Sequence, residues 1–207
     1  MLEAVTRRFG AQVEVKWHAY ELRPAPAPMP DPDSDYISEH WQHRVLPMAA
    51  ERGLVMRVPR RQVRSRRALQ AALFARERGQ FTAMDRRIFR ARFEEDLDIS
   101  DIDVLAGLGR ECGLDAEALR YALSANAYLD ELEFDLQLAQ AIGISGVPAA
   151  LVGPAVEDLR EFLAGAEPVI GAVPEEWMAG AVERALTGDG QHARLRQRFR
   201  RDIPLDE

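Results

Sequence analysis

The sequence has one cysteine and no long hydrophobic run. With Cys112 alone, no disulfide within the chain and no Cys-x-x-Cys pair can form. The most apolar stretch, residues 141–156, is broken by three glycines and two prolines, so it cannot supply the roughly 18 apolar residues of a membrane span. The first ten residues, MLEAVTRRFG, carry charges where a secretory signal needs an apolar core. We therefore expect a cytoplasmic protein with no membrane contact.

Positive charge is also scarce relative to negative charge. The chain has 27 Lys and Arg against 34 Asp and Glu, a net charge of −7, and Lys16 is its one lysine. An acidic chain is a poor general binder of nucleic acid. The arginines between Arg57 and Arg78 are the best candidates for such contacts, but a solvated helix face explains them. We expect no nucleic-acid partner.

The N-terminal third predicts a helix, a strand and a linker. Apolar residues recur at helical spacing over residues 2–9, and Gly10 follows as a helix end. In Val13–Trp17 apolar and polar residues alternate, which is typical of a strand with one buried face. Five prolines in residues 24–32 then favour an extended linker.

The middle of the chain, residues 35–142, has helical periodicity throughout and predicts about six helices. Pro47 should kink or end the first of them, because proline lacks the N–H that a helix interior needs. Later helices are predicted to begin at capping residues, namely Ser65, Thr82, Ser100 and Asp115.

The last third predicts strands again. Residues 148–152 form a short apolar strand, residues 159–166 are its expected hairpin partner, and Pro174 opens a helix. After Thr187 the sequence is polar and rich in arginine. The order of these elements predicts an α/β domain interrupted by a helical insertion.

Several motifs that resemble known sites are explained by ordinary structure. Cys112 falls at a helix C-terminus, where the helix dipole opposes a thiolate. His40 and His43 lack a third metal ligand, and the acidic residues 94–103 lack the glycine and final glutamate of a calcium loop, so we expect no metal. Residues 107–112 are not a dinucleotide-binding turn, and residues 143–147 are not a nucleophile elbow.

The segment GISGVPAALVG, residues 143–153, carries a resemblance to a known family. Together with VEVKWHAYELRP and the helical segments RSRRALQAALFARERGQF and DLDISDIDVLAGLGRECGLD, it resembles the DsbA-like thioredoxin fold, in particular its FrnE-like branch and the 2-hydroxychromene-2-carboxylate isomerase superfamily. The similarity covers the chain from Leu2 to Leu186. It implies a thioredoxin-like domain made of residues 1–33 and 143–187, a helical insertion at 34–142 and a polar tail at 188–207.

The resemblance also implies a site. In that family the valine–proline bond is cis, and its loop faces a Cys-x-x-Cys at the start of the first helix. Gly146, Val147 and Pro148 would therefore bind substrate, with the backbone of Val147 pairing with an extended peptide or a glutathione-like thiol. The implied reaction is attack of a thiolate, stabilised at a helix N-terminus, on a substrate disulfide.

The family's first strand and its Cys-x-x-Cys have no counterpart in these 207 residues. We therefore expect an N-terminally incomplete thioredoxin-like fold with no catalytic residue in this chain, and a thiol-disulfide oxidoreductase whose cysteines lie outside it. Two alternatives remain: a non-redox peptide-binding protein, and a glutathione-dependent isomerase or transferase of kappa-class type. No bound cofactor is expected, glutathione could serve as cosubstrate, and a homodimer is left open.

Overall fold

The computed structural model describes residues 2–188, which form two compact units. Among the described residues, the first unit combines 2–20 with 135–188, and the second comprises 21–134. Each is described by itself below. No helix in the described part of the chain is long and apolar enough to cross a bilayer. The predicted tail, apart from Gly188, lies outside the described residues.

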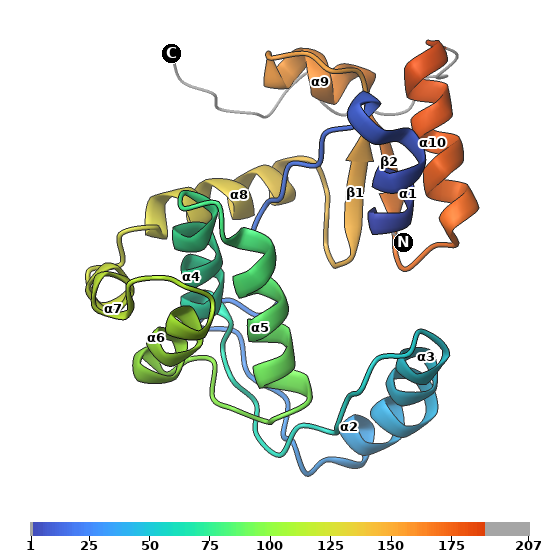
Figure 1. Cartoon of the computed structure of the whole chain (residues 1–207). Coiled ribbons are helices and arrows are strands. Elements are labelled where there is room, and N and C mark those ends of the chain that lie inside the picture. Colours follow the sequence, from blue (N-terminus) through green and yellow to red (C-terminus); the bar gives the residue numbers. More distant parts are fainter. Residues whose placement is uncertain (1, 189–207) are drawn as a thin grey trace. The chain divides into compact units, whose positions relative to one another are not determined.

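The first unit is built on a two-stranded antiparallel sheet (Figure 1). Its strands are β1 (Ala149–Val152) and β2 (Glu167–Ile170). Its helical elements are α1 (Leu2–Phe9), the 3₁₀ turn η1 (Gly10–Gln12), α9 (Leu159–Gly165), α10 (Glu175–Thr187) and the second part of α8 (Leu129–Ala141).

One small apolar core holds α1 and α10 against this sheet. Val5 of α1, Val169 of β2 and Met178 of α10 are buried together with Ala181 and Val182. Each apolar face is covered by the next element, because burial removes about 25 cal/mol of unfavourable hydration for every Å² of apolar surface. Packing in this core sets the position of α1 and α10 along the direction of the strands.

Which residue pairs of β1 and β2 are hydrogen-bonded decides which backbone groups point toward the partner strand and which point outward. Ala149 lies opposite Ile170, and Ala150 lies opposite Val169. The amide of Gly171 donates to the carbonyl of Pro148 over 2.8 Å, which makes Pro148 and Gly171 a hydrogen-bonded pair. Since such pairs alternate in an antiparallel ladder, the backbone N–H and C=O groups of Ala149 and Ile170 point away from the partner strand.

The second unit is entirely helical among its regular elements. It contains α2 (Asp35–His40), the π-helix η2 (Trp41–Val45), α3 (Leu46–Glu51), α4 (Arg66–Arg76), α5 (Phe81–Phe93), α6 (Ile102–Glu111), α7 (Ala116–Ser124) and the first part of α8. Its most buried side chains come from α4 to α8 and include Phe74, Met84, Leu105, Leu119 and Leu132. The predicted helical insertion is therefore present.

Two predicted strands are wrong. Residues 13–17 form no strand, since no strand of the described residues lies beside them to complete a ladder, and Trp17 is 47% exposed. Residues 159–165 are the helix α9, because the carboxylate of Asp158 accepts a hydrogen bond from the amide of Glu161 and caps it. The true partner of β1 is the next segment, Glu167–Ile170.

Helix boundaries also differ in places from the sequence prediction. Asp115 caps α7 as expected, but α5 begins before Thr82, and the cap of α6 is Asp101 instead of Ser100. Pro47 neither ends nor breaks the first helical segment. It follows the π-helical turn η2 and occupies the first turn of α3, where the missing N–H costs little.

The compact units divide at 20/21 and 134/135, whereas the sequence prediction placed the boundaries at 33/34 and 142/143. Two buried carboxylates account for the difference. Glu21, 3% exposed, accepts a hydrogen bond from Arg66 of α4 over 2.9 Å, which ties it to the helical unit. Asp135, 4% exposed, lies 2.6 Å from the ring nitrogen Nδ1 of His18 and accepts a hydrogen bond from the amide of Ala19, which ties it to the sheet unit.

Replacing Arg66 with methionine should destabilise the helical unit. The buried carboxylate of Glu21 would lose its cation, and its second oxygen already lacks a hydrogen-bond partner. Removing one member of a buried pair costs several kcal/mol, and because Arg66 is one-third exposed we expect about 2 kcal/mol. Urea unfolding measures this loss.

The neighbouring change Arg67→Met is the matched control. It removes only an exposed hydrogen bond to the carbonyl of Ser100, so its cost should stay below about 1 kcal/mol. Equal losses in the two variants would contradict the role given to the Glu21–Arg66 pair.

Candidate functional site

The loop between α8 and β1 forms the wall of a pocket of about 230 Å³. The pocket lies within the first unit and is lined by residues 143–148 together with Ile170 and Gly171. All three residues that the resemblance assigned to substrate binding, Gly146, Val147 and Pro148, are in this lining. We call it the proline-loop pocket.

The sequence directs the chain into this loop by ending α8 abruptly. Gly143 has a φ of +76°, a left-handed conformation that glycine adopts without a side-chain clash. The amide of Ile144 then donates to the carbonyl of Ala139, and that of Gly143 donates to the carbonyl of Gln140. These two bonds satisfy the last carbonyls of the helix and turn the chain toward β1.

At the other end of the loop, the ladder anchors Pro148. The Val147–Pro148 peptide bond is cis, which is the geometry that the resemblance implies. The carbonyl of Pro148 accepts the hydrogen bond from Gly171, so the strand ends hold both walls of the pocket. Val147 is 55% exposed, and it therefore presents its side chain and backbone at the pocket mouth.

An unpaired strand edge adjoins the pocket. Ala149 and Leu151 direct their backbone N–H and C=O groups away from β2, and among the described residues no strand pairs with that edge. Unpaired edge groups can bind the backbone of an added extended segment. The pocket, with Val147 exposed beside it, has room for a side chain of a ligand.

The start of α1 lies at the same end of the sheet. Figure 1 shows its first turn at the end where β1 begins.

Cys112, the one cysteine, belongs to the helical unit and not to this site. It is the C-cap residue of α6, as the sequence predicts. Burial raises the pKa of its thiol, the adjacent Glu111 raises it further, and Arg87 only partly offsets this. Less thiolate is then present at neutral pH than for an ordinary cysteine, so Cys112 is a weak nucleophile.

The other candidate residues form no metal centre. Within residues 2–188, no group of three or more His, Cys, Asp or Glu side chains converges on a common point. Much of the acidic segment 94–103 pairs with arginines instead: Arg92 bonds to Asp96, and Arg87 bonds to Glu95. These ion pairs and two helix ends account for the acidic run.

Sequence reasoning missed part of the pocket wall. Ile170 and Gly171 line it, but the strand that carries them was assigned to the preceding residues. A local signal was present, since Val169 and Ile170 are β-branched and Gly171 follows them as a turn residue with a φ of +89°.

Alkylation should show the low reactivity of Cys112. Because its pKa is raised, its reaction with iodoacetamide at pH 7.4 should be slower than that of a cysteine in an unstructured blocked peptide. Its rate should rise with pH and reach half its maximum above the ordinary thiol value of about 8.5. A half-maximal rate at pH 7 or below, measured by mass spectrometry, would contradict this assignment.

Comparison with known proteins agrees with the geometry. A family model, the DSBA-like thioredoxin domain, matches residues 1–179. The Bacillus subtilis (strain 168) protein YwbO, itself uncharacterized, is 34% identical over 151 residues, which are 71% of this chain and 76% of YwbO.

A solved structure shares the fold. The crystal structure of a "probable DsbA oxidoreductase" from Streptomyces coelicolor superposes with a TM-score of 0.68 at 24% identity, covering 100% of this chain and 84% of that one. With the family match over most of its length, this chain belongs to the DSBA-like thioredoxin domain family.

Proposed function

We propose that the proline-loop pocket binds an extended peptide or a small thiol or disulfide, and that the protein acts in thiol–disulfide exchange as a FrnE-like member of its family. The observation that carries this proposal is the pocket lined by Val147 and Pro148, at which Val147 is exposed. Membership of the DSBA-like family and the fold shared with the Streptomyces protein support it.

In this proposal the backbone of Val147 aligns the substrate. An extended peptide pairs with the backbone of the exposed Val147. Its cysteine side chain enters the pocket between Gly146 and Ile170. Alignment of this kind favours exchange because the three sulfur atoms must lie nearly in line.

The exchange itself needs a pair of cysteines from outside these 207 residues. One thiolate attacks a sulfur of the substrate disulfide, a mixed disulfide forms, and the other substrate sulfur leaves as a thiolate. The second cysteine of the pair then attacks the mixed disulfide and releases the reduced substrate. Cys112 cannot replace this pair, since it is single and its pKa is raised.

A second candidate is peptide binding without redox chemistry. The observation in its favour is that these 207 residues contain the pocket but no reactive thiol beside it. In that case the proline loop alone carries the function.

Binding at the pocket is tested by filling it. A Cβ at Gly146 meets nothing within 4 Å, so Gly146→Leu should fold normally and occupy the pocket mouth. We expect the blocked peptide Ac-Ala-Val-Cys(S-methyl)-Val-Ala-NH₂ to shift the amide NMR signals of Ile144, Val147 and Gly171. Losing a well-placed side-chain contact should weaken binding about tenfold in this variant.

Gly107→Leu is the matched control, because a Cβ at Gly107 also meets open space and that residue lies in the helical unit. It should bind the peptide as the wild type does. Unchanged binding in Gly146→Leu, or signal shifts confined to other residues, would exclude the pocket as the binding site.

The coding DNA upstream of Met1 separates the two candidates. A reading frame that continues upstream and encodes a strand followed by Cys-x-x-Cys supports the oxidoreductase, and the protein with that segment should reduce insulin with dithiothreitol. An in-frame stop codon directly before Met1 would exclude the oxidoreductase with upstream cysteines and favour the non-redox peptide-binding protein. If the 207-residue chain reduced insulin and lost this activity on Cys112→Ser, both candidates would be wrong, because each assigns no redox role to Cys112.

A further inference from the structure

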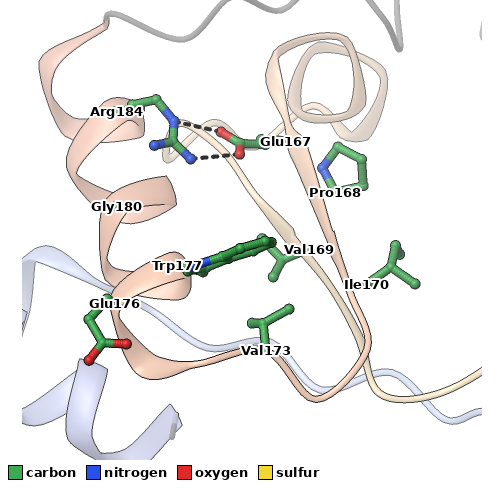
Figure 2. Close-up of a pocket in the computed structure, with 9 residues that line it drawn as sticks. All are labelled: Glu167, Pro168, Val169, Ile170, Val173, Glu176, Trp177, Gly180 and Arg184. Carbon is green, nitrogen blue, oxygen red and sulfur yellow. Dashed lines mark hydrogen bonds and ion pairs between the residues drawn. The ribbon is translucent and has the colours of Figure 1, made fainter.

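A second groove lies between β2 and α10, on a surface that the proposed thiol chemistry does not use (Figure 2). Its volume is about 460 Å³, and all of it belongs to the first unit. Ile170 lines both this groove and the proline-loop pocket, but Glu176 and Trp177 line only this one. We call it the tryptophan groove.

One face of α10 shapes the groove. Trp177, Gly180 and Arg184 recur at intervals of three and four residues, so they lie on the same side of the helix. Gly180 has no side chain, and the guanidinium of Arg184 lies close to it, since a Cβ at Gly180 would come within 3.3 Å of Arg184 Nη1. Figure 2 shows the indole of Trp177 extending from α10 toward β2, with Val169 and Val173 beside it.

The indole is unusually available for a ligand. Trp177 is 68% exposed and Ile170 is 57% exposed, although both are large apolar side chains at one groove. Exposed apolar groups that lie together in a hollow mark interaction sites more often than isolated ones do. The ring offers a flat face on which a planar cation can stack.

The charges of the groove are unequal. Arg184 forms two hydrogen bonds with Glu167, of 2.9 and 2.7 Å, so these two charges neutralise each other. Glu176 has no hydrogen-bond or ion-pair partner among the described residues, and its exposed carboxylate stands at the start of α10. One negative charge therefore remains in the groove lining, on the residue next to Trp177, and Figure 2 shows its exposed carboxylate directed away from the indole.

The outer edge of β2 supplies backbone partners. The N–H and C=O groups of Ile170 point outward, whereas Pro168 has no N–H to offer. An extended peptide can thus form a two-hydrogen-bond pair with Ile170 and cannot continue a regular ladder past Pro168. The edge favours a short peptide segment over a long added strand.

We propose that the tryptophan groove docks a short extended segment of a protein partner, with an arginine side chain stacked on Trp177 and paired with Glu176. The guanidinium group matches both features, because it is planar enough to stack and can bond a carboxylate through two N–H groups. An acidic ligand would meet the unpaired Glu176, and a second copy of a chain with net charge −7 would meet general repulsion. Charge complementarity therefore selects a basic partner.

The test compares two blocked peptides, Ac-Val-Arg-Val-NH₂ and Ac-Val-Gln-Val-NH₂, titrated into the full chain and followed by amide and indole NMR signals. We expect the arginine peptide to bind about fivefold more tightly and to shift Ile170, Val173 and the indole of Trp177. Equal affinity for the two peptides, or no shift at these residues, overturns the proposal.

Two neighbouring glutamates provide matched variants. Glu176→Gln and Glu175→Gln each remove one negative charge from the first turn of α10, but only Glu176 lines the groove. Glu176→Gln should weaken the arginine peptide about threefold to fivefold, while Glu175→Gln should change its affinity less than twofold. Equal weakening in both variants means that only the general field of the helix start attracts the peptide, and the docking proposal fails.

Trp177→Leu should weaken the arginine peptide about tenfold, and the exposed position keeps the fold intact. Gly146→Leu, which fills the other pocket, should leave the affinity unchanged. Loss of arginine-peptide binding in Gly146→Leu would place this ligand in the proline-loop pocket and overturn the separate site.

Discussion

The hydrogen bond from the amide of Gly171 to the carbonyl of Pro148 sets the phase of the β1–β2 ladder, and both proposed binding surfaces depend on that phase. It turns the backbone of Ala149 outward on one edge of the sheet and that of Ile170 outward on the other. A shift of one residue would exchange the outward and inward groups and move Val169 out of the core. The ladder therefore links the packing of α10 to the placement of the proline loop.

Two buried carboxylates fix how the chain leaves and re-enters the sheet unit. Asp135 contacts His18 and the amide of Ala19 on the sheet side, whereas Glu21 pairs with Arg66 on the helical side. Burying a carboxylate costs free energy unless it is hydrogen-bonded or paired. Each of these two carboxylates therefore favours the unit that holds its partner. Long insertions into a small domain need such anchors, because the inserted chain adds little to the parent core.

The two surfaces differ in chemistry although they share Ile170. The proline-loop pocket combines glycines and a strand edge, with no charged side chain in its lining. The tryptophan groove has an aromatic wall and an unpaired carboxylate. We propose a sulfur-bearing peptide as the ligand of the first and a basic segment as the ligand of the second. If one partner engaged both surfaces, the second contact would be intramolecular and would strengthen the first.

Local patterns in the sequence predicted most of the helices and much of the proline-loop pocket. Helical spacing, Asp115 as a cap and Gly143 as a stop all act within a few residues, so they can be recognised without a fold. The ordered resemblance then singled out Gly146, Val147 and Pro148, which the structure places in one pocket lining.

Pairing over long distances was decided only by the tertiary structure. The alternation in Val13–Trp17 looks like a strand, but a strand also needs a neighbour, and none of the described residues provides one. The segment from Leu159 was likewise predicted as a strand. The cap at Asp158 favours a helix there, and Glu167–Ile170 is the strand that pairs with β1. The tryptophan groove likewise needs β2 beside α10. Sequence determined the periodicity of each element, and the fold decided which edges and side chains meet, because hydrogen-bond partners and burial are properties of neighbours in space.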